Sequence, residues 1–244
     1  MFRKTAISTI AAIGLMAASS ASQAYQIFSG LDVDGSGTTR ASFTNSNIAS
    51  ASFQSFLEGV GTEDFESGAI SPLVFPGAGT ATLSGSAILQ THGAGTDGAG
   101  RYPHSGTHYV ETNSTSFSIT FNTGVAAFGF YGMDIGEFGG DLRLTAHLTG
   151  GGTLSFDVPN ASAGQDGSAL FYGLIAQTGD LLINKIDFTD TNPGSGDAFA
   201  FDDMTVGSLE QVCRTSCTVP EPGSLSLIGL ALFGLGAVRR RKMA

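Results

Sequence analysis

Short runs of alternating hydrophobic and polar residues fill the chain between residues 61 and 208. In the run 116–121, Phe117, Ile119 and Phe121 alternate with serine and threonine, as is typical of an antiparallel strand with one buried face. Strands are expected at 80–89, 108–112, 116–121, 125–132, 142–148, 153–158, 169–176, 181–188 and 198–206. Because no helical pattern alternates with them, the sequence predicts an all-β body, a β-sandwich of the jelly-roll type.

One short helix is expected before this sandwich, within residues 45–59. A Ser or Asn suited to cap a helix precedes the segment and Gly59 ends it. Four apolar residues recur in it at roughly helical spacing: Ile48, Phe53, Phe56 and Leu57. The Gly-rich stretch before it, 25–40, is predicted to be irregular.

The N-terminal residues have the pattern of a secretory signal. Two basic residues precede an apolar stretch at 5–18, and small residues occupy the positions expected before a cleavage site after Ala24. We expect signal peptidase to cleave there and to leave Tyr25 as the first residue. An N-terminal membrane anchor is the alternative, but the apolar stretch is shorter than the ~20 residues of a span.

The C-terminal residues differ in character from the body. A Pro-Glu-Pro triplet leads into residues 223–238, which are uncharged, and four basic residues follow that run. As a helix, 223–238 would reach about 24 Å, against about 30 Å for the hydrocarbon core of a bilayer. This predicts a marginal transmembrane helix. Its basic end would remain cytoplasmic, so the body would face outward.

These parts, in this order and spacing, resemble the PEP-CTERM sorting signal of exported proteins in Gram-negative bacteria. The residues that carry the resemblance are Val219, Pro220, Glu221, Pro222, Arg239, Arg240 and Arg241, followed by Lys242. The resemblance implies recognition at the inner membrane by an exosortase, a membrane cysteine protease, and cleavage near the Pro-Glu-Pro motif. The mature protein is then expected at the cell surface or in the extracellular polysaccharide matrix.

The body is also similar to the β-sandwich domains of such proteins, in runs 59–66, 129–144 and 199–207. The expected organisation is a signal peptide at 1–24, an N-terminal segment with the helix at 25–60, the sandwich at 61–208, a linker at 209–218 and the sorting signal at 219–244. The linker contains both cysteines, Cys213 and Cys217. In an oxidising, exported compartment their spacing predicts a local disulfide, with intermolecular pairing as the alternative.

The net charge of the body limits the partners that it can bind. Residues 25–238 contain 21 acidic and five basic residues, a formal charge of −16. Such a body repels nucleic acid and anionic membrane surfaces and favours divalent cations. The sequence therefore predicts no nucleic-acid partner.

Six carboxylates are candidate ligands of a structural Ca²⁺: Asp64, Glu66, Asp134, Glu137, Asp141 and Asp203. Three of them crowd one Gly-rich connection, and the others flank the first and last strands of the sandwich, which lie close together in many jelly rolls. Solvated loops are the alternative. Strand alternation would place Phe201, Asp203 and Thr205 on one face and Asp202 and Met204 on the other.

Two loops offer further candidate chemistry. Asp32, Asp34 and Ser36 alternate as at the start of a calcium loop, although Phe43 stands where such a loop has a glutamate; an ordinary turn is the alternative. The loop 101–109 contains Arg101, Tyr102, His104, His108 and Tyr109. It suits contact with carbohydrate, with a plain loop as the alternative.

Common catalytic motifs are missing from the sequence: there is no nucleophile elbow, no zinc-protease motif and no phosphate-binding loop. We therefore predict a non-enzymatic surface or matrix protein whose sandwich binds or organises polysaccharide. The alternative is a secreted hydrolase that acts on the matrix with a pair of carboxylates.

Overall fold

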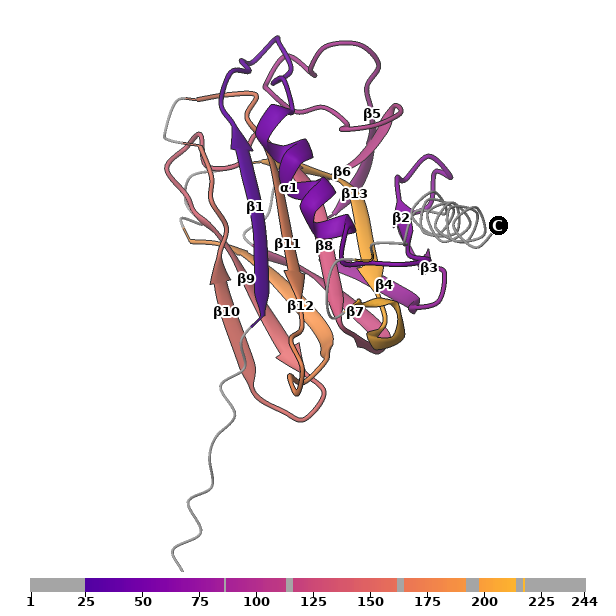
Figure 1. The fold of residues 1–244 in the computed structure, drawn as a ribbon. Coiled ribbons are helices and arrows are strands. Elements are labelled where there is room, and N and C mark those ends of the chain that lie inside the picture. Colours follow the sequence, from indigo (N-terminus) through magenta and orange to yellow (C-terminus); the bar gives the residue numbers. More distant parts are fainter. Residues whose placement is uncertain are drawn as a thin grey trace, which may run out of the picture.

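The computed structural model describes residues 25–85, 87–112, 116–161, 165–191, 198–213 and 217. In this part of the chain, two antiparallel sheets pack face to face, and one helix, α1 (Thr44–Gln54), lies on the outer side of one of them (Figure 1). The prediction of an all-β body with one short helix is confirmed.

The first sheet contains seven strands. Along the sheet they are β1 (Gln26–Asp32), β11 (Ala169–Ile175), β8 (Ala127–Met133), β13 (Phe199–Gly207), β6 (His108–Thr112) and β5 (Ile88–Thr91), with β2 (Gly61–Glu63) paired to β13. Apart from β5 and β6, neighbours in this order are not consecutive in sequence, because from β6 onward every connection except β9–β10 crosses to the other sheet.

The second sheet contains six strands. In order they are β10 (Thr153–Asp157), β9 (Leu142–Leu148), β12 (Ile183–Asp190), β7 (Ser116–Val125), β4 (Gly79–Gly85) and β3 (Leu73–Phe75). Between the sheets lies a core rich in phenylalanine. Phe117 and Phe188 stack with ring centroids 4.2 Å apart, and Phe201 meets Phe188 edge-on at 5.2 Å, a geometry that adds to the stabilisation from burial.

The strand predictions from 108 onward agree closely with the structure, and the earlier part of the chain differs from its prediction. The run 80–89 forms two strands, since β4 ends at Gly85 and β5 belongs to the other sheet. The stretch predicted to be irregular contains β1, which pairs along its whole length with β11. The sandwich thus begins before residue 61. Strand β1 escaped prediction because Ser29 and Gly30 interrupt its alternation.

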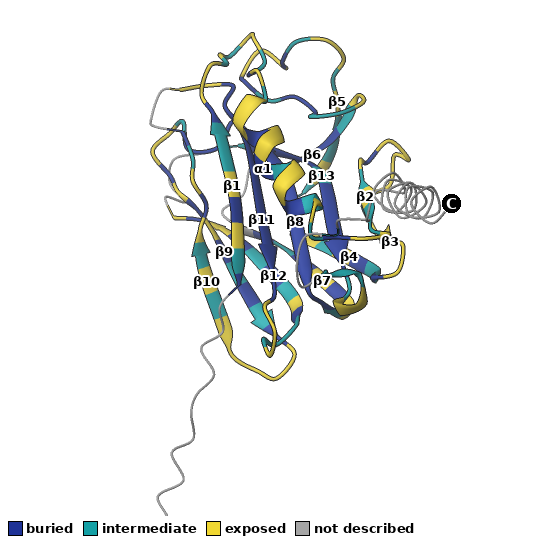
Figure 2. Cartoon of the chain, viewed as in Figure 1, coloured by how far each residue is buried: buried dark blue, intermediate teal, exposed yellow. Residues whose placement is uncertain are grey.

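Helix α1 packs against β1, β11 and β8 (Figures 1 and 2). Its buried residues are Ser46, Ala49 and Phe53, whereas Ile48 is 64% exposed. Ile48, which helical spacing groups with Phe53, therefore lies on the exposed side of the helix. The helix turns small residues to the sheet because it lies very close to it: a Cβ on Gly30 of β1 would be 2.2 Å from the Asn45 carbonyl oxygen.

Phe53 is the one large side chain that α1 inserts fully into this interface, and glycines make room for it. Gly129 of β8 and Gly173 of β11 are directly paired across the two strands. A Cβ on Gly173 would lie 2.7 Å from the Phe53 ring, and one on Gly129 would lie 3.0 Å from it. The ring thus rests on backbone, and the paired glycines set the depth of the helix.

An aspartate from β1 holds the N-terminal end of α1. Asp32 Oδ1 accepts the Asn45 N–H at 2.8 Å, and Oδ2 accepts the Ser46 N–H at 2.9 Å and the Ser46 hydroxyl at 2.7 Å. The two N–H groups belong to the first helical turn, whose backbone N–H groups have no acceptors within the helix. Asp32 thus caps the helix, and Asp34 accepts the Ser42 N–H.

Both terminal predictions fall outside the described residues: the signal with its cleavage site after Ala24, and the sorting signal at 219–244 with its expected transmembrane helix. Within the part of the chain that the structure describes, no helix is long and apolar enough to cross a membrane.

Truncation of two helical residues distinguishes the buried side of α1 from its exposed side. We expect Phe53→Ala to lower the free energy of unfolding by about 3–5 kcal/mol, because it empties the site over the paired glycines. Ile48→Ala, on the exposed side of the same helix, serves as the control and changes stability by less than about 0.5 kcal/mol. Denaturant unfolding measures both; equal losses would contradict the packing described.

Candidate functional site

A β-bulge in β13 shapes the most polar region of the sheet beneath α1. Asp202 pairs with Tyr131 of β8 and Thr205 pairs with Gly129, so β13 has one extra residue between these positions. Asp203 lies in this bulge and has a positive φ of 45°. A bulge of this kind redirects side chains.

The bulge makes the predicted faces of this strand wrong. Phe201 and Met204 both belong to the core between the sheets. Thr205 faces the helix instead, where its Oγ1 accepts a hydrogen bond from Gln54 Nε2 at 3.1 Å. Asp202 is fully buried and Asp203 partly buried.

Around the bulge lies a group of four polar residues that we call the bulge cluster: His104, Ser105, Asp202 and Asp203. His104 Nδ1 is 2.5 Å from Asp203 Oδ2, and the Ser105 hydroxyl donates to Asp203 Oδ1 at 2.9 Å. Asp202 accepts the Ser105 N–H at 3.0 Å and the Asp203 N–H at 2.8 Å. The two carboxylates thus tie the 104–105 loop to the last strand.

The His104 ring is clamped between helix and sheet. It stacks on Tyr131 with centroids 3.5 Å apart, and the Phe43 ring meets it edge-on at 4.7 Å. Its Nε2 lies 3.2 Å from Asn47 Oδ1, which also accepts the Tyr131 hydroxyl at 2.8 Å. Both ring nitrogens therefore face oxygen atoms. The ring is thus held in place as a structural link between α1 and β13.

Burial dominates the electrostatics of the bulge cluster. Burial first and the neighbouring Asp203 charge second raise the pKa of the Asp202 carboxyl to about 8, against the opposing effect of the N–H donors. Asp202 therefore keeps a proton at pH values where an ordinary aspartate is ionised.

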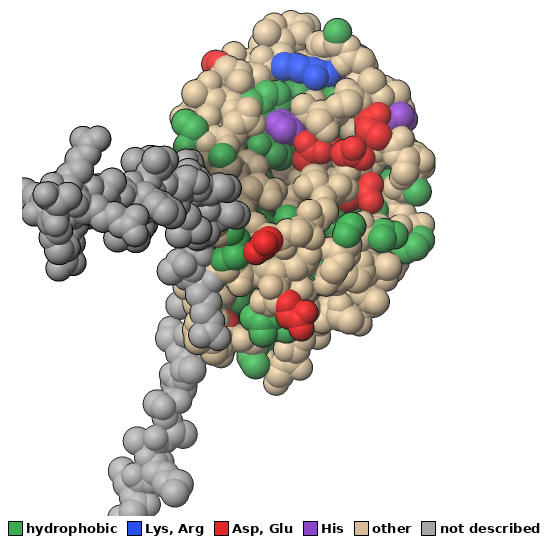
Figure 3. Space-filling view, turned by 45° about the vertical axis from the view of Figure 1, so that its right-hand side comes forward, with side chains coloured by type: hydrophobic (Ala, Val, Ile, Leu, Met, Phe, Trp, Pro, Cys, Tyr) green, Lys and Arg blue, Asp and Glu red, His purple; other side chains and the backbone are tan. Residues whose placement is uncertain are grey.

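Farther along the same loop, at 107–108, the chain also binds the carboxylate of Glu66. Glu66 Oε1 accepts the Thr107 N–H at 2.7 Å and the His108 N–H at 2.6 Å. These two N–H donors, that of His108 first, lower the pKa of Glu66 to about 2. Acidic side chains accordingly gather beside histidines on this side of the body (Figure 3).

The six candidate calcium ligands lie in two separate places. Glu66 and Asp203 contact the same loop, and Asp64 accepts the Glu66 N–H. Asp134 lies elsewhere, where its Oδ1 accepts the Gly167 N–H at 2.7 Å. Glu137 and Asp141 lie in the connection that follows Asp134.

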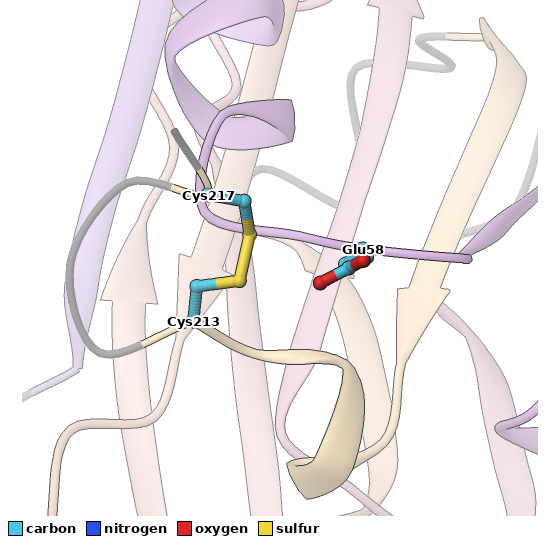
Figure 4. Close-up of side chains that lie close together, drawn as sticks. All are labelled: Glu58, Cys213 and Cys217. Carbon is cyan, nitrogen blue, oxygen red and sulfur yellow. A yellow bond between two sulfur atoms is a disulfide. The ribbon is translucent and has the colours of Figure 1, made fainter. Parts of the chain in front are cut away.

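Among the described residues, one group of three metal-type side chains has ligand atoms within 4.8 Å of one another: Glu58, Cys213 and Cys217 (Figure 4). The two cysteines form the disulfide that their spacing predicts, with Cα atoms 5.6 Å apart. Their sulfur atoms are therefore bonded to each other and do not form a thiolate site.

The tyrosines of the loop 101–109 do not offer their rings to a ligand. Tyr102 and Tyr109 are 0% and 2% exposed. The Tyr102 hydroxyl donates to the Gly167 carbonyl and accepts the Ala41 N–H, both at 2.9 Å. These rings hold loops together from inside, so the interpretation that they contact sugar is wrong.

The outer side of the second sheet carries a different polar surface. Its strands alternate, so that Ile186 and Phe188 of β12 enter the core while their neighbours face outward. An open depression of about 410 Å³ lies there, lined by Ser84, Gly85, Phe117, Ser118, Lys185, Asp187 and Thr189. We call its polar members, Ser84, Ser118, Lys185, Asp187 and Thr189, the polar sheet face.

Side-chain contacts order this polar sheet face. Asp187 accepts from Lys185 Nζ at 2.7 Å and lies 2.6 Å from His147 Nε2 of β9. Ser84 of β4 and Ser118 of β7 are 3.2 Å apart. Sequence reasoning overlooked this surface, because the polar half of each alternating strand was interpreted only as its solvent side. The register of β4, β7 and β12, which sequence alone does not give, places these residues side by side.

The raised pKa of Asp202 predicts how stability depends on pH. The native state holds this proton more tightly than the unfolded chain, whose aspartates titrate near about 4, so the stabilisation is lost as pH rises from about 4 to about 8. Asp202→Asn should flatten this fall, because the amide does not titrate. The exposed Glu210→Gln is the control and keeps the native slope. An unchanged slope in Asp202→Asn, measured by urea unfolding across pH, would contradict the assignment.

In comparison with known protein families, one model matches part of this chain. Residues 218–242 match the PEP-CTERM protein-sorting motif. No curated protein matches the chain in sequence.

Solved structures resemble the body only distantly. The K2 cleaved adhesin domain of Lys-gingipain is 14% identical, with a TM-score of 0.39, over 61% of this chain and 99% of that domain. The CBM22-1 xylan-binding domain of Xyn10C from Paenibacillus barcinonensis is 13% identical, with a TM-score of 0.39, over 65% and 97%. A family 29 carbohydrate-binding module, CBM29-2, is 15% identical, with a TM-score of 0.34, over 63% and 96%. Likeness at this level carries no argument about function. The chain thus joins an all-β sandwich to a PEP-CTERM protein-sorting motif at its C-terminal end.

Proposed function

We propose that the chain is an exported protein whose C-terminal tail is processed by an exosortase and whose sandwich acts at the cell surface or in the extracellular matrix. The match at residues 218–242 is the observation that carries this proposal. The tail starts directly after Cys217, the last described residue of the body. Body and sorting motif are therefore adjacent, as expected for a folded domain delivered by a removable tail.

The N-terminal side of the body is compatible with export. Cleavage after Ala24 leaves Tyr25 as the first residue, and its ring is already buried, with its hydroxyl donating to the Leu181 carbonyl. The Cys213–Cys217 disulfide suits an oxidising compartment outside the cytoplasm. Signal peptidase and the inner membrane are thus proposed as transient partners.

We further propose that the sandwich binds polysaccharide through the polar sheet face, without catalysis. Hydroxyls of Ser84, Ser118 and Thr189 lie beside the charged pair Lys185 and Asp187, an arrangement of donors and acceptors that suits a ligand rich in hydroxyl groups. The depression of about 410 Å³ lies in the usual range for small-ligand sites. The body's formal charge of −16 favours a neutral or cationic polysaccharide over an anionic one.

Structural calcium stays a prediction. The carboxylates proposed to bind it already accept hydrogen bonds within the body, as Glu66, Asp134 and Asp203 do. The proposal above does not require the ion.

Replacement of the motif by alanine tests the sorting proposal. In Pro220→Ala/Glu221→Ala/Pro222→Ala, we expect the tail to stay attached, because the protease loses its recognition sequence. The protein then keeps its tail mass and stays in the inner-membrane fraction, whereas the Glu210→Gln control is processed normally. Mass spectrometry and cell fractionation give both readouts. A variant with the same mass and location as the parent protein would contradict exosortase processing.

Two cationic side chains of the second sheet provide a matched test of polysaccharide binding. Lys185 lies in the depression, whereas Arg143 pairs with Asp157 outside it. On an array of neutral polysaccharides, we expect Lys185→Ala to weaken binding about tenfold, the effect of one hydrogen bond from a charged donor, and Arg143→Ala to leave it unchanged. Equal losses, no binding by the parent protein, or release of sugar products would each contradict the proposal.

A further inference from the structure

The segment that follows β13 runs back along the end of helix α1. After the short helix η1 (Leu209–Gln211), the Gln211 carbonyl accepts the Glu58 N–H at 2.9 Å. Cys213 then donates its N–H to the Phe56 carbonyl at 2.8 Å, and Cys217 donates to the Ser55 carbonyl at 2.6 Å. The body thus holds the chain up to the residue that precedes the sorting motif.

The disulfide makes the last of these contacts possible. Cys213 and Cys217 are four positions apart, yet their N–H groups reach carbonyls of consecutive residues, Phe56 and Ser55. The S–S bond holds the Cα atoms of the two cysteines 5.6 Å apart, so that both lie beside the end of the helix. The two N–H groups thereby satisfy carbonyls at the C-terminal end of α1, which have no partners within the helix.

This attachment limits the reach of the motif. Pro220 follows Cys217 by three positions, so an extended chain places it at most about 10 Å from the anchored Cys217. If the disulfide opens and Cys217 leaves the helix, Cys213 becomes the last anchor. Pro220 then follows the anchor by seven positions, and its reach grows to about 24 Å.

This difference in the reach of Pro220 matters because the tail is expected to enter the membrane. Gly223, directly after the triplet, starts the uncharged run expected in the bilayer, so the closed loop keeps the folded body against the membrane surface. A protease binds its substrate as an accessible, unfolded segment, and a body within about 10 Å of the cleaved bond hinders that access.

We propose that the Cys213–Cys217 disulfide is a redox-controlled tether that restricts the processing protease's access to the Pro-Glu-Pro motif. This inference rests on the proposed function and adds its regulation. Opening the disulfide lengthens the linker and speeds release of the body. The partner is a dithiol reductant outside the cytoplasm, and both cysteines are partly exposed to it.

The redox step balances as a thiol–disulfide exchange. One thiolate of the reductant attacks a sulfur of the Cys213–Cys217 bond and forms a mixed disulfide, and the other cysteine leaves as a thiolate and takes up a proton. The second thiolate of the reductant then displaces the remaining cysteine. The tether gains two electrons and two protons, and the reductant becomes a disulfide.

Two variants of the full chain, followed by pulse-chase in the native cells, test the tether. Cys213→Ser/Cys217→Ser removes the bond and should raise the initial rate of tail removal several-fold. A second variant keeps the disulfide and gains five Gly/Ser residues between Cys217 and Thr218. This insertion adds about 17 Å of reach and should raise the rate to a similar extent, because linker length is the controlling quantity.

The insertion keeps the test valid if loss of the bond also destabilises the body. A parental rate in the insertion variant overturns the tether, whatever the cysteine variant does, and so does a parental rate in a folded cysteine variant. Hydrogen exchange gives a readout independent of processing: reduction of the purified chain should remove protection from the Cys217 amide. Retained protection would also overturn the tether.

Failure of the tether and failure of the proposed function are distinguishable. If the motif-to-alanine variant is unprocessed while the insertion changes nothing, exosortase processing stands and the tether fails. If the motif-to-alanine variant is processed like its parent, the proposed function itself fails.

Discussion

The first sheet must be buried on both faces, and much of the structure depends on this constraint. Every residue of β8 and β11 is buried. The second sheet covers their inner face, and on the outer face a single short helix covers them (Figure 2). Such a helix covers the sheet only by lying close to it, which explains the paired glycines under Phe53 and the small residues that α1 turns inward.

The polar features of the protein follow from the same arrangement. Asp32 holds the start of the helix, His104 of the bulge cluster contacts Asn47 in its first turn, and the two cysteines hydrogen-bond to the residues directly after its end. The second sheet has no such helix among the described residues. Its outer side therefore keeps the alternating polar side chains of its strands, and there the polar sheet face lies. The polar groups with a structural role thus lie around the covered first sheet, and the surface proposed to bind a ligand lies on the uncovered second sheet.

Sequence reasoning succeeded where one physical signal dominated. Short apolar runs, many of them alternating with polar residues, identified the strands from 108 onward, and cysteine spacing identified the disulfide. It was insufficient where distant parts of the chain decide the outcome. Ile48 is more hydrophobic than Ala49, but the close approach to Gly30 admits only the smaller side chain. One extra residue at Asp203 likewise reversed the faces of β13, a change that a pattern of period two cannot reveal.

We propose a folded body that a removable tail delivers. Mass spectrometry of the mature protein from native cells tests this claim most directly, because it reads both ends of the chain at once. We predict a polypeptide that starts at Tyr25 and ends at or near the Pro-Glu-Pro triplet, without residues 223–244. A mature chain that still ends at Ala244 would contradict it.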